Sequence, residues 1–372
     1  MATQKVLGIL GGGQLAQMMA LAAIPLGIKC HIYEPDPLAP ARLCAIHHCA
    51  PYDDEAALRQ FAAAVDVITY EFENVPVDCG TFLRTLKPVA PGIAALRICQ
   101  DRLLEKTFAR DLGFTTAPFV DLVASLTSAD AIAAVGLPAI LKTRRLGYDG
   151  KGQQTVHTIA ELDTARACYE GHPLILEGFV TFAHEVSIIA ARAADGTTVR
   201  FPLIQNTHHH GILRTAVAPA PCSTKGLEQD ADRMMQTVMH AFGYIGVLSI
   251  ECFVVETTQG PTLVINEFAP RVHNSGHWSI EGARTSQFAY HVRAVTGLIL
   301  PDVTLHGVAA MCNLIGDEPD DSEIPPDVFV HRYHKAPRPR RKVGHLTMVS
   351  STHDNVTHLL QHCAQLLGVK IS

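Results

Sequence analysis

Residues 5–34 read KVLGILGGGQLAQMMALAAIPLGIKCHIYE, and they determine the fold of the first part of the chain. An apolar run predicts a strand, three glycines a turn, a periodic apolar pattern a helix, and a second apolar run another strand. A polar, helix-like segment at 53–64 and a third apolar run at 65–73 repeat this order. Strands that alternate with helices predict a parallel sheet with crossover helices, so we expect a doubly wound α/β domain over residues 1–100.

The glycines of this stretch match a dinucleotide-binding pattern. Residues Gly11 to Ala16 (GGGQLA) fit G-x-G-x-x-A between a strand and a helix, and Glu34 ends the next strand. The same glycines would also let the N-terminus of a helix approach another phosphate or anion. A tight strand-to-helix turn without a ligand is the third interpretation, and these residues alone leave all three open.

The composition is that of a soluble, enzyme-sized globular protein. The chain has 372 residues, enough for two or three packed domains, and 48% of them are hydrophobic. The formal charge is −6 and basic residues gather only near 142–151 and 335–342, so no nucleic-acid partner is expected. The ten cysteines include no CxxC pair, which indicates reduced thiols. The longest apolar run, at 15–28, is too short to cross a bilayer, so we expect a cytoplasmic protein without a membrane partner.

A glycine-rich, basic loop is expected at 141–153, where the sequence reads LKTRRLGYDGKGQ. It is not a Walker A loop, because Arg145 stands where the first glycine is required and Gly152 follows the lysine in place of Ser or Thr. Its glycines would still let backbone N–H groups turn toward a phosphate, and Lys142 supplies a fixed charge at the end of a strand. The alternative is an exposed, charged loop with no ligand.

A second unit is predicted to begin near Asp101 with an amphipathic helix. After it we expect a strand that runs into the basic loop, a helix at 160–170 and a strand at 173–180. The dipeptide Asp195-Gly196 predicts a tight hairpin between the strands on either side of it. One more strand is predicted at 345–350.

Two carboxylates stand inside β-rich runs at 246–271, which we expect to pair as a hairpin centred near Thr258-Gln259. In that register Glu251 lies opposite Asn266 and diagonal to Glu267, to within one residue. Unpaired buried carboxylates are costly. Two of them beside a carboxamide offer hard oxygen ligands for Mg²⁺, which completes its shell with phosphate and water. A partly exposed hairpin face is the alternative.

Ten segments between residue 6 and about residue 350 carry a common signature. They read ILGGGQLAQMM, ITYEFENVP, QDRLLEK, LKTRRLGYDGKGQ, LEGFV, HEVSIIAAR, HHHGILRTAVAPAP, GVLSIECF, INEFAPRVHNSGHWSIEGARTSQF and HKAPRPRRKVGHLT. Together, and in this order, they resemble the ATP-grasp ligases called 5-(carboxyamino)imidazole ribonucleotide synthases, from purine biosynthesis. The resemblance implies a mixed α/β and α+β ATP-grasp fold: a pre-ATP-grasp domain at 1–100, an ATP-grasp domain at 101–297, and a small C-terminal domain at 298–372 that completes the substrate site.

The resemblance also implies a reaction. ATP, bicarbonate and 5-aminoimidazole ribonucleotide would give ADP, phosphate and the N-carboxylated ribonucleotide through carboxyphosphate, on the route to IMP. The expected cofactors are ATP and Mg²⁺, with Mn²⁺ as a substitute, and the expected assembly is a homodimer. The alternatives are another ATP-grasp ligase of purine metabolism, an NAD-dependent oxidoreductase that uses Gly11 to Ala16 and Glu34, and a non-catalytic nucleotide-binding protein.

By position, the resemblance assigns three groups of residues. The implied ATP-binding residues are Arg102, Lys142, Gly147, Tyr148, Asp149, Gly150, Lys151, Gly152, Gln153, Glu177, Gly178, Phe179, Val180, Glu185, His208, Asn266 and Glu267. The implied metal ligands are Glu251 and Glu267. The implied residues for the ribonucleotide are Gln14, Glu73, Tyr148, Asp149, Arg271, His273, Asn274, Ser275, Lys335, Arg341 and Lys342.

Three of these residues are expected to act in catalysis. Lys142 would stabilise the transferred phosphoryl group, Arg271 would hold bicarbonate or the developing carboxylate, and Asp149 would steer the amine or its proton. An ion pair with a neighbouring cation is the alternative for Asp149. The sequence departs from the family pattern at Gln17, where an arginine is common, and at Arg340, where a glycine is usual.

Overall fold

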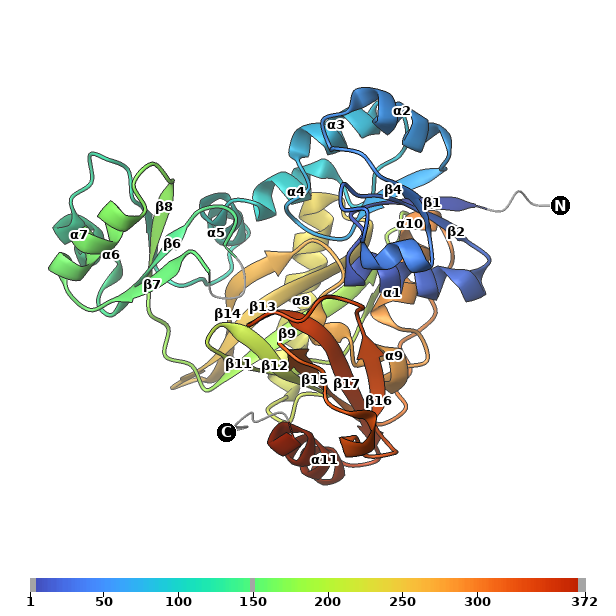
Figure 1. Cartoon of the computed structure of the whole chain (residues 1–372). Helices are drawn as coiled ribbons and strands as arrows, with labels where there is room; N and C mark the ends of the chain where they lie inside the picture. Colours follow the sequence, from blue (N-terminus) through green and yellow to red (C-terminus); the bar gives the residue numbers. More distant parts are fainter. Residues whose placement is uncertain (1–4, 148–150, 367–372) are drawn as a thin grey trace.

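The N-terminal part of the protein is built on a parallel sheet, as predicted (Figure 1). In the computed structural model, which describes residues 5–147 and 151–366, its strands pair in the order β3-β2-β1-β4 and all run parallel. Its elements are β1 (Val6–Leu10), α1 (Gln14–Ala23), β2 (Lys29–Tyr33), β3 (Ile46–His48), α2 (Glu55–Ala63), β4 (Val67–Tyr70), α3 (Val77–Arg84) and α4 (Ile93–Cys99).

A second sheet, of four strands, carries the basic loop. Its order is β5-β8-β6-β7, and each pair is antiparallel. The elements of this unit are α5 (Arg102–Asp111), β5 (Phe119–Asp121), α6 (Ser128–Val135), β6 (Ala139–Thr143), β7 (Gln153–Val156), α7 (Ile159–Cys168) and β8 (Leu174–Gly178). They confirm the predicted helices and strands of this region. The small sheet projects from the rest of the molecule with α6 and α7, at the left of Figure 1.

The largest sheet has nine strands in the order β14-β13-β9-β11-β12-β15-β17-β16, with β10 paired to β9. The strands are β9 (His184–Arg192), β10 (Thr198–Arg200), β11 (Ile204–His209), β12 (Ile212–Ala218), β13 (Gly246–Thr257), β14 (Gly260–Ala269), β15 (Val308–Ile315), β16 (Phe329–Arg332) and β17 (Lys342–Ser350). The hairpin predicted at Asp195-Gly196 joins β9 and β10 and is confirmed. Alternate residues of β9 and β13 pack on α8 (Lys225–Phe242) and on α10 (Gln287–Thr296), so the two helices cover opposite faces.

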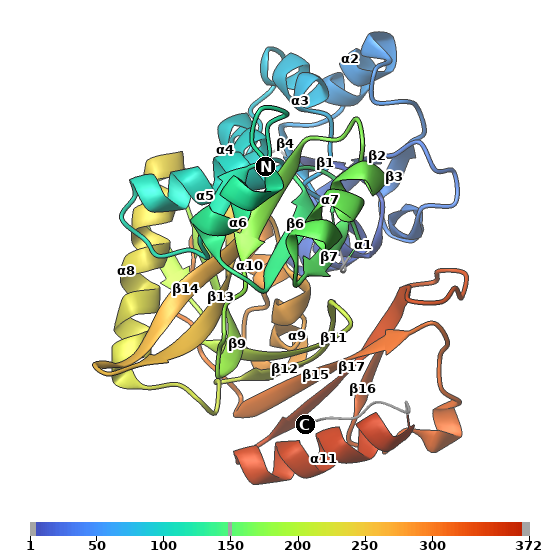
Figure 2. The same cartoon turned by 90° about the vertical axis from the view of Figure 1, so that its left-hand side faces the viewer.

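The C-terminal strands continue this sheet through the pairing of β12 with β15. Helix α11 (His353–Leu366) packs along β15 and β17, and the short helix α9 (Ser279–Gly282) also contacts both strands. Figure 2 shows α11 below the C-terminal strands. No local pattern in the sequence indicates which distant strand pairs with β15, so this pairing could not be predicted.

A buried histidine connects the N-terminal sheet to the largest sheet. His291 of α10 accepts a hydrogen bond from the backbone N–H of Val247 at Nδ1 (3.0 Å), and its Nε2 lies 2.8 Å from Oγ1 of Thr69 in β4. Burial lowers the pKa of His291 to about 3, so the ring is neutral. Among the described residues, no helix combines the length and the apolar character that crossing a membrane requires.

Candidate active site

A cavity of about 970 Å³ lies where the N-terminal sheet, the small sheet, β13–β14 and the C-terminal strands meet. The predicted residues that line it are Gln14, Glu73, Arg102, Lys142, Gly147, Lys151, Gln153, Glu185, His208, Glu251, Asn266, Glu267, Arg271, His273, Asn274, Lys335, Arg341 and Lys342. Side chains drawn from almost the whole length of the sequence thus come together in one place. We call it the central cavity.

Other predicted residues stand behind its wall or beyond it. Tyr148, Asp149 and Gly150 lie outside the described residues. The remaining predicted residues that do not line the central cavity are Gly152, Glu177, Gly178, Phe179, Val180 and Ser275. Glu177 and Ser275 are buried, whereas Phe179 is half exposed.

Lys142 is held in place by a buried carboxylate. Its Nζ lies 2.9 Å from Oε2 of Glu177, and Nζ of Lys106 lies 3.1 Å from the same oxygen. Burial alone would raise the pKa of Glu177, but the charges of the two lysines outweigh burial and lower it to about 2. Two ammonium groups against one carboxylate leave a net positive charge at the wall, which suits an anionic ligand.

The two candidate metal ligands face each other across β13 and β14. Glu251 pairs with Glu267 and not with Asn266, so the predicted register is wrong by one residue at this point. The predicted pairing holds from the turn as far as Cys252, where a β-bulge makes Asn266 the extra residue. Bulges re-aim side chains beside active sites. Here the bulge places both glutamates at the central cavity.

The carboxylate pair suits a divalent cation. Oε1 of Glu251 lies 3.1 Å from Nε2 of His273, and Oε2 of Glu267 lies 3.1 Å from Nη1 of Arg102. Burial, together with the charge of Glu267, raises the pKa of Glu251 to about 7. A bound cation would relieve that repulsion. The donor set of carboxylate oxygens with one carboxamide, from Asn266, fits Mg²⁺ or Mn²⁺.

Another acid–base pair and an apolar surface stand on β9, β11, β13 and the residues just before β9. Oε2 of Glu185 lies 2.5 Å from Nδ1 of His208. Burial alone would lower the pKa of His208, but the hydrogen bond to Glu185 and the charge of Glu251 raise it above its usual value. Phe182 and Phe253 also line the central cavity and stack with ring centroids 4.6 Å apart. Sequence reasoning missed this aromatic pair.

Two predicted substrate residues belong to pairs that join distant parts of the chain. Arg271 forms an ion pair with Glu73, and its Nη1 donates to the carbonyl oxygen of Val272 (3.0 Å). Lys335 donates a hydrogen bond to Oε1 of Gln14. Four more basic residues close to Lys335 in sequence also line the cavity: Arg338, Arg340, Arg341 and Lys342. This concentration of cations suits a phosphate group.

The segment that follows Arg271 is fixed by side-chain amides. Gln287 accepts from the backbone N–H of His273 (2.9 Å) and donates to the carbonyl oxygen of the same residue (2.6 Å). Asn274 and Asn313 of β15 pair through their side-chain amides. Burial lowers the pKa of His273 well below its usual value, so the ring is neutral and its Nε2–H can donate to Glu251.

Comparison with known proteins identifies the family. Residues 4–100 match the ribonucleotide synthetase preATP-grasp domain, residues 107–288 the ATP-grasp domain, and residues 309–359 the phosphoribosylaminoimidazole carboxylase C-terminal domain. An N5-carboxyaminoimidazole ribonucleotide synthase of Pseudomonas aeruginosa is 45% identical over 344 residues, which are 92% of this chain and 94% of that protein. The chain belongs to the N5-carboxyaminoimidazole ribonucleotide synthase family. The predicted family, ATP-grasp fold and ligase class are confirmed.

Solved structures of N5-carboxyaminoimidazole ribonucleotide synthases have the same fold. The enzyme from Thermus thermophilus superposes with a TM-score of 0.93 at 43% identity, over 98% of this chain and 99% of that chain. The enzyme from Aspergillus clavatus, solved with ADP and 5-aminoimidazole ribonucleotide, superposes with a TM-score of 0.89 at 26% identity, over 99% of this chain and 100% of that chain.

In this member of the N5-carboxyaminoimidazole ribonucleotide synthase family, the glycine loop holds a carboxylate of the protein itself. Glu71 accepts hydrogen bonds from the backbone N–H groups of Gly13 and, at 2.8 Å, of Ala16. A Cβ atom on Gly11 would lie 2.4 Å from Cγ of Glu71, and the φ of Gly11 is 104°. The glycines therefore make room for Glu71, which takes the helix N-terminus that a dinucleotide pyrophosphate would need. This contradicts the NAD interpretation.

The structure also accounts for arginines that the sequence left unassigned. Nη2 of Arg144 lies 2.7 Å and Nε of Arg145 3.5 Å from Oδ2 of Asp101. Asp101 in turn caps α5 by accepting from the backbone N–H of Leu103 (3.1 Å). Arg340 has a φ of 65°, a left-handed conformation that favours glycine, the residue that the family resemblance led us to expect there.

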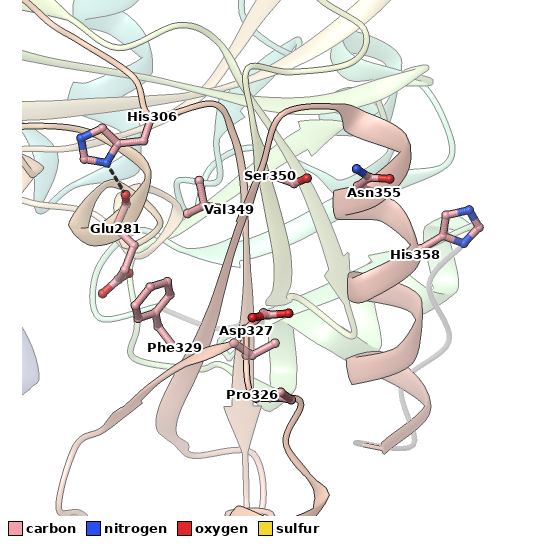
Figure 3. A pocket seen from close by; sticks show the side chains of 10 residues that line it. Glu281, His306, Pro326, Asp327, Phe329, Val349, Ser350, Asn355 and His358 are labelled. Atoms are coloured by element: carbon pink, nitrogen blue, oxygen red, sulfur yellow. Dashed lines mark hydrogen bonds between the residues drawn. The ribbon is translucent and has the colours of Figure 1, made fainter.

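A second cavity, of about 780 Å³, lies between α9, the strands β16 and β17, and α11 (Figure 3). Its wall includes Glu281, whose carbonyl oxygen lies 2.8 Å from Nδ1 of His306, and His358 of α11. None of the predicted site residues lines it. Among the described side chains, which leave out those of residues 1–4, 148–150, 359 and 362–372, no group of three or more His, Cys, Asp or Glu could hold a metal ion, here or elsewhere.

Proposed function

We propose that this chain catalyses the carboxylation of 5-aminoimidazole ribonucleotide by bicarbonate and ATP, with release of N5-carboxyaminoimidazole ribonucleotide, ADP and phosphate. The observation that carries the proposal is the central cavity, in which Lys142 and the pair Glu251 and Glu267 share one space with Arg271 and the cations at 335–342. A volume of about 970 Å³ is sufficient for two small substrates. The Aspergillus clavatus enzyme was solved with ADP and 5-aminoimidazole ribonucleotide bound, which supports this assignment.

The first step in this proposal is phosphoryl transfer. A bicarbonate oxygen attacks the γ-phosphorus of ATP, the bond from that phosphorus to the bridging oxygen breaks, and carboxyphosphate and ADP form. Such a transfer needs positioning and charge neutralisation more than covalent help from the protein. Lys142 and Arg102 line the cavity with positive charge for this purpose. The implied contacts of ATP with Gly147 to Gln153 and with Glu177 to Val180 belong to the same proposal.

The second step joins the carboxyl group to the amine. The exocyclic nitrogen of the ribonucleotide attacks the carboxyl carbon of carboxyphosphate, the bond from that carbon to the phosphate oxygen breaks, and the nitrogen loses a proton. We assign acceptance of that proton to Asp149, which lies outside the described residues. We assign stabilisation of the negative carboxylate to Arg271. The substrate 5′-phosphate is assigned to Lys335, Arg341 and Lys342.

Glu251 and Glu267, with Asn266 beside them, would hold Mg²⁺ or Mn²⁺. When bound, the ion neutralises phosphate charge and orients the phosphates. Arg102 and His273 each engage one oxygen of these glutamates, and they would hold the carboxylates in place as the ion enters. Glu185 is assigned to the ribose hydroxyls of ATP, since a carboxylate offers two acceptor oxygens.

The experiment that tests the proposed function measures ADP release with each substrate omitted in turn. We expect release to require 5-aminoimidazole ribonucleotide and bicarbonate together, because no other class of ATP-dependent enzyme predicts both requirements. ADP release that continues without bicarbonate would refute the assignment. A cytoplasmic homodimer with domains at 1–100, 101–297 and 298–372 completes the proposal, and light scattering in solution would measure the oligomeric state.

A further inference from the structure

Helix α5 bonds to β14, the strand that carries the candidate metal ligand Glu267, at three successive residues. Arg102, Glu105 and Lys106 stand at spacings of three and four, which places them on one face of the helix. Each of them bonds to one residue of β14: Arg102 to Oε2 of Glu267 (3.1 Å), Glu105 to the backbone N–H of Phe268 (2.6 Å), and Lys106 to the carbonyl oxygen of Asn266 (3.0 Å). The helix therefore fixes the backbone on both sides of Glu267.

Lys106 makes the bond that the bulge requires. Asn266 is the extra residue in the β13–β14 ladder, so β13 offers its backbone no regular partner. The ammonium group of Lys106 donates a hydrogen bond to the carbonyl oxygen of Asn266. A buried carbonyl without a partner would cost about as much as a lost hydrogen bond. The bulge that places Glu267 at the cavity is thus held by Lys106.

The same ammonium group reaches the small sheet. Nζ of Lys106 lies 3.1 Å from Oε2 of Glu177 in β8, and its side chain is 1% exposed. Lys142 in β6 contacts the same oxygen. If Lys106 were absent, Glu177 would neutralise Lys142 alone, and the wall would lose the net positive charge that faces the cavity. One buried lysine therefore links the strand that bears Glu267 to the strands that bear Glu177 and Lys142.

We propose that Lys106 is a positioning residue for the phosphoryl-transfer step. It holds the small sheet beside β14, so that Lys142 and Glu267 face the same nucleotide. It also places a second positive charge at Glu177, so that Glu177 does not fully neutralise Lys142. The inference rests on the proposed function, because it takes ATP to be the nucleotide that these two sheets hold. Lys106 itself stands behind the wall and does not line the cavity.

The experiment uses the full chain and the variant Lys106→Met, which keeps the length of the side chain and removes its charge. Calorimetric titration with ADP in EDTA should show about tenfold weaker binding, the middle of the range for groups that share one charge network. With Mg²⁺, the concentration of the ion that gives half-maximal ADP release should rise by about 10- to 100-fold, as it does when the groups that orient metal ligands are removed. The KM for 5-aminoimidazole ribonucleotide should not change.

The matched control is Ala109→Gly, on the same helix. Ala109 is fully buried and packs in the core between α5 and α8. This change should lower the melting temperature and leave ADP affinity unaltered. It therefore separates a loss of stability from a displacement of Lys142 and Glu267. Two results would overturn the proposal. The first is that Lys106→Met binds ADP as tightly as the wild type. The second is a lower kcat with no change in any KM or in the Mg²⁺ requirement.

A double variant keeps the test decisive if Lys106→Met does not fold. Lys106→Met with Glu177→Gln removes both charges of the Lys106–Glu177 pair together. Lys142 loses its carboxylate partner in this double variant and in Glu177→Gln alone, so comparing the two variants cancels that loss. Because Lys106 acts through Glu177, the double variant should bind ADP about as well as Glu177→Gln alone. Additive losses would contradict the proposed route. ADP affinity is measured without turnover, so failure of the proposed carboxylation would not change its outcome.

Discussion

Asn274 and Asn313 exchange two hydrogen bonds between their side-chain amides. Nδ2 of Asn274 donates to Oδ1 of Asn313 (3.0 Å), and Nδ2 of Asn313 donates to Oδ1 of Asn274 (2.6 Å). Asn313 also donates to the carbonyl oxygen of Leu213 in β12. The pair joins a C-terminal strand to the segment that follows Arg271. It therefore sets the position of residues assigned to the ribonucleotide.

The first prediction concerns Asn313→Leu, which keeps the size of the side chain and removes both hydrogen bonds to Asn274, whose Nδ2 still lies 3.1 Å from Nδ1 of His277. Oδ1 of Asn274 and the carbonyl oxygen of buried Leu213 would lose the donor that Asn313 supplies. A buried polar group that loses its partner costs about 1–3 kcal/mol, so the free energy of unfolding should fall by that amount. The KM for 5-aminoimidazole ribonucleotide should rise more than the KM for ATP, because Asn274 lies in the segment assigned to the ribonucleotide. Equal changes in the two KM values would show that the pair serves stability alone.

The second prediction concerns Glu267→Gln. The change removes one negative charge from the candidate metal site and keeps a side chain of the same shape opposite Glu251. Affinity for the divalent ion should fall by on the order of 100-fold or more, since loss of a direct ligand exceeds the effect of groups behind it. Titration of ADP release with Mg²⁺ measures the shift. If the variant releases ADP at the wild-type rate at low Mg²⁺, Glu267 is not a metal ligand.

The third prediction is a pH dependence of stability that originates at His291. Its pKa is lowered from 6.5 to about 3 in the folded protein. Between these values only the unfolded chain takes up the proton. The contribution of His291 to the free energy of unfolding is therefore fully present above pH 6.5 and should fall by about 1.4 kcal/mol for each pH unit below it, down to pH 3. Urea unfolding between pH 7 and pH 5 measures the slope.

The variant His291→Gln checks the source of that slope. Its amide can donate toward Thr69 and it does not titrate, so the pH dependence should become shallower although the protein is less stable at pH 7. If the two proteins lose stability in parallel as the pH falls, another group is responsible.

The fourth prediction concerns Glu71→Gln at the glycine loop. Gly13 and Ala16 donate to different oxygens of Glu71, and a glutamine has one acceptor oxygen, so its NH₂ group would face one of these N–H donors. The free energy of unfolding should fall by about 1–3 kcal/mol, as measured by urea denaturation. Fluorescence titration of the wild-type protein with NADH should show no binding, because the carboxylate of Glu71 holds the helix N-terminus. Saturable NADH binding would reverse this conclusion.

Local patterns in the sequence predicted much of the fold because they report local physics. The alternation of apolar strands and helices in the first hundred residues predicted the parallel sheet, and Asp195-Gly196 predicted the turn between β9 and β10. The hairpin of Glu251 and Glu267 was predicted to within one residue. The error came from the bulge at Asn266, which depends on the contact with Lys106 far away in the sequence.

The parts that could not be predicted depend on distant partners. A G-x-G-x-x-A pattern reports a backbone that can approach an anion, and it does not tell a cofactor from the carboxylate of Glu71. Likewise, the segment QDRLLEK shows charges at helical spacing, yet nothing in it indicates that Glu105 and Lys106 point at β14. The assignment of individual residues to ATP and to the ribonucleotide came from the family resemblance and stays a prediction.

The contact between Gln14 and Lys335 spans 321 positions of the chain, and this separation has a consequence for protein synthesis. Lys142, Glu177, Glu251 and Glu267 have all left the ribosome well before Lys335 is added. At about 5–20 residues per second, tens of seconds separate the first residue of this contact from the last. A chain released early would therefore contain the groups assigned to ATP and lack the cations assigned to the ribonucleotide phosphate. Only the finished polypeptide brings the two ends of the cavity together.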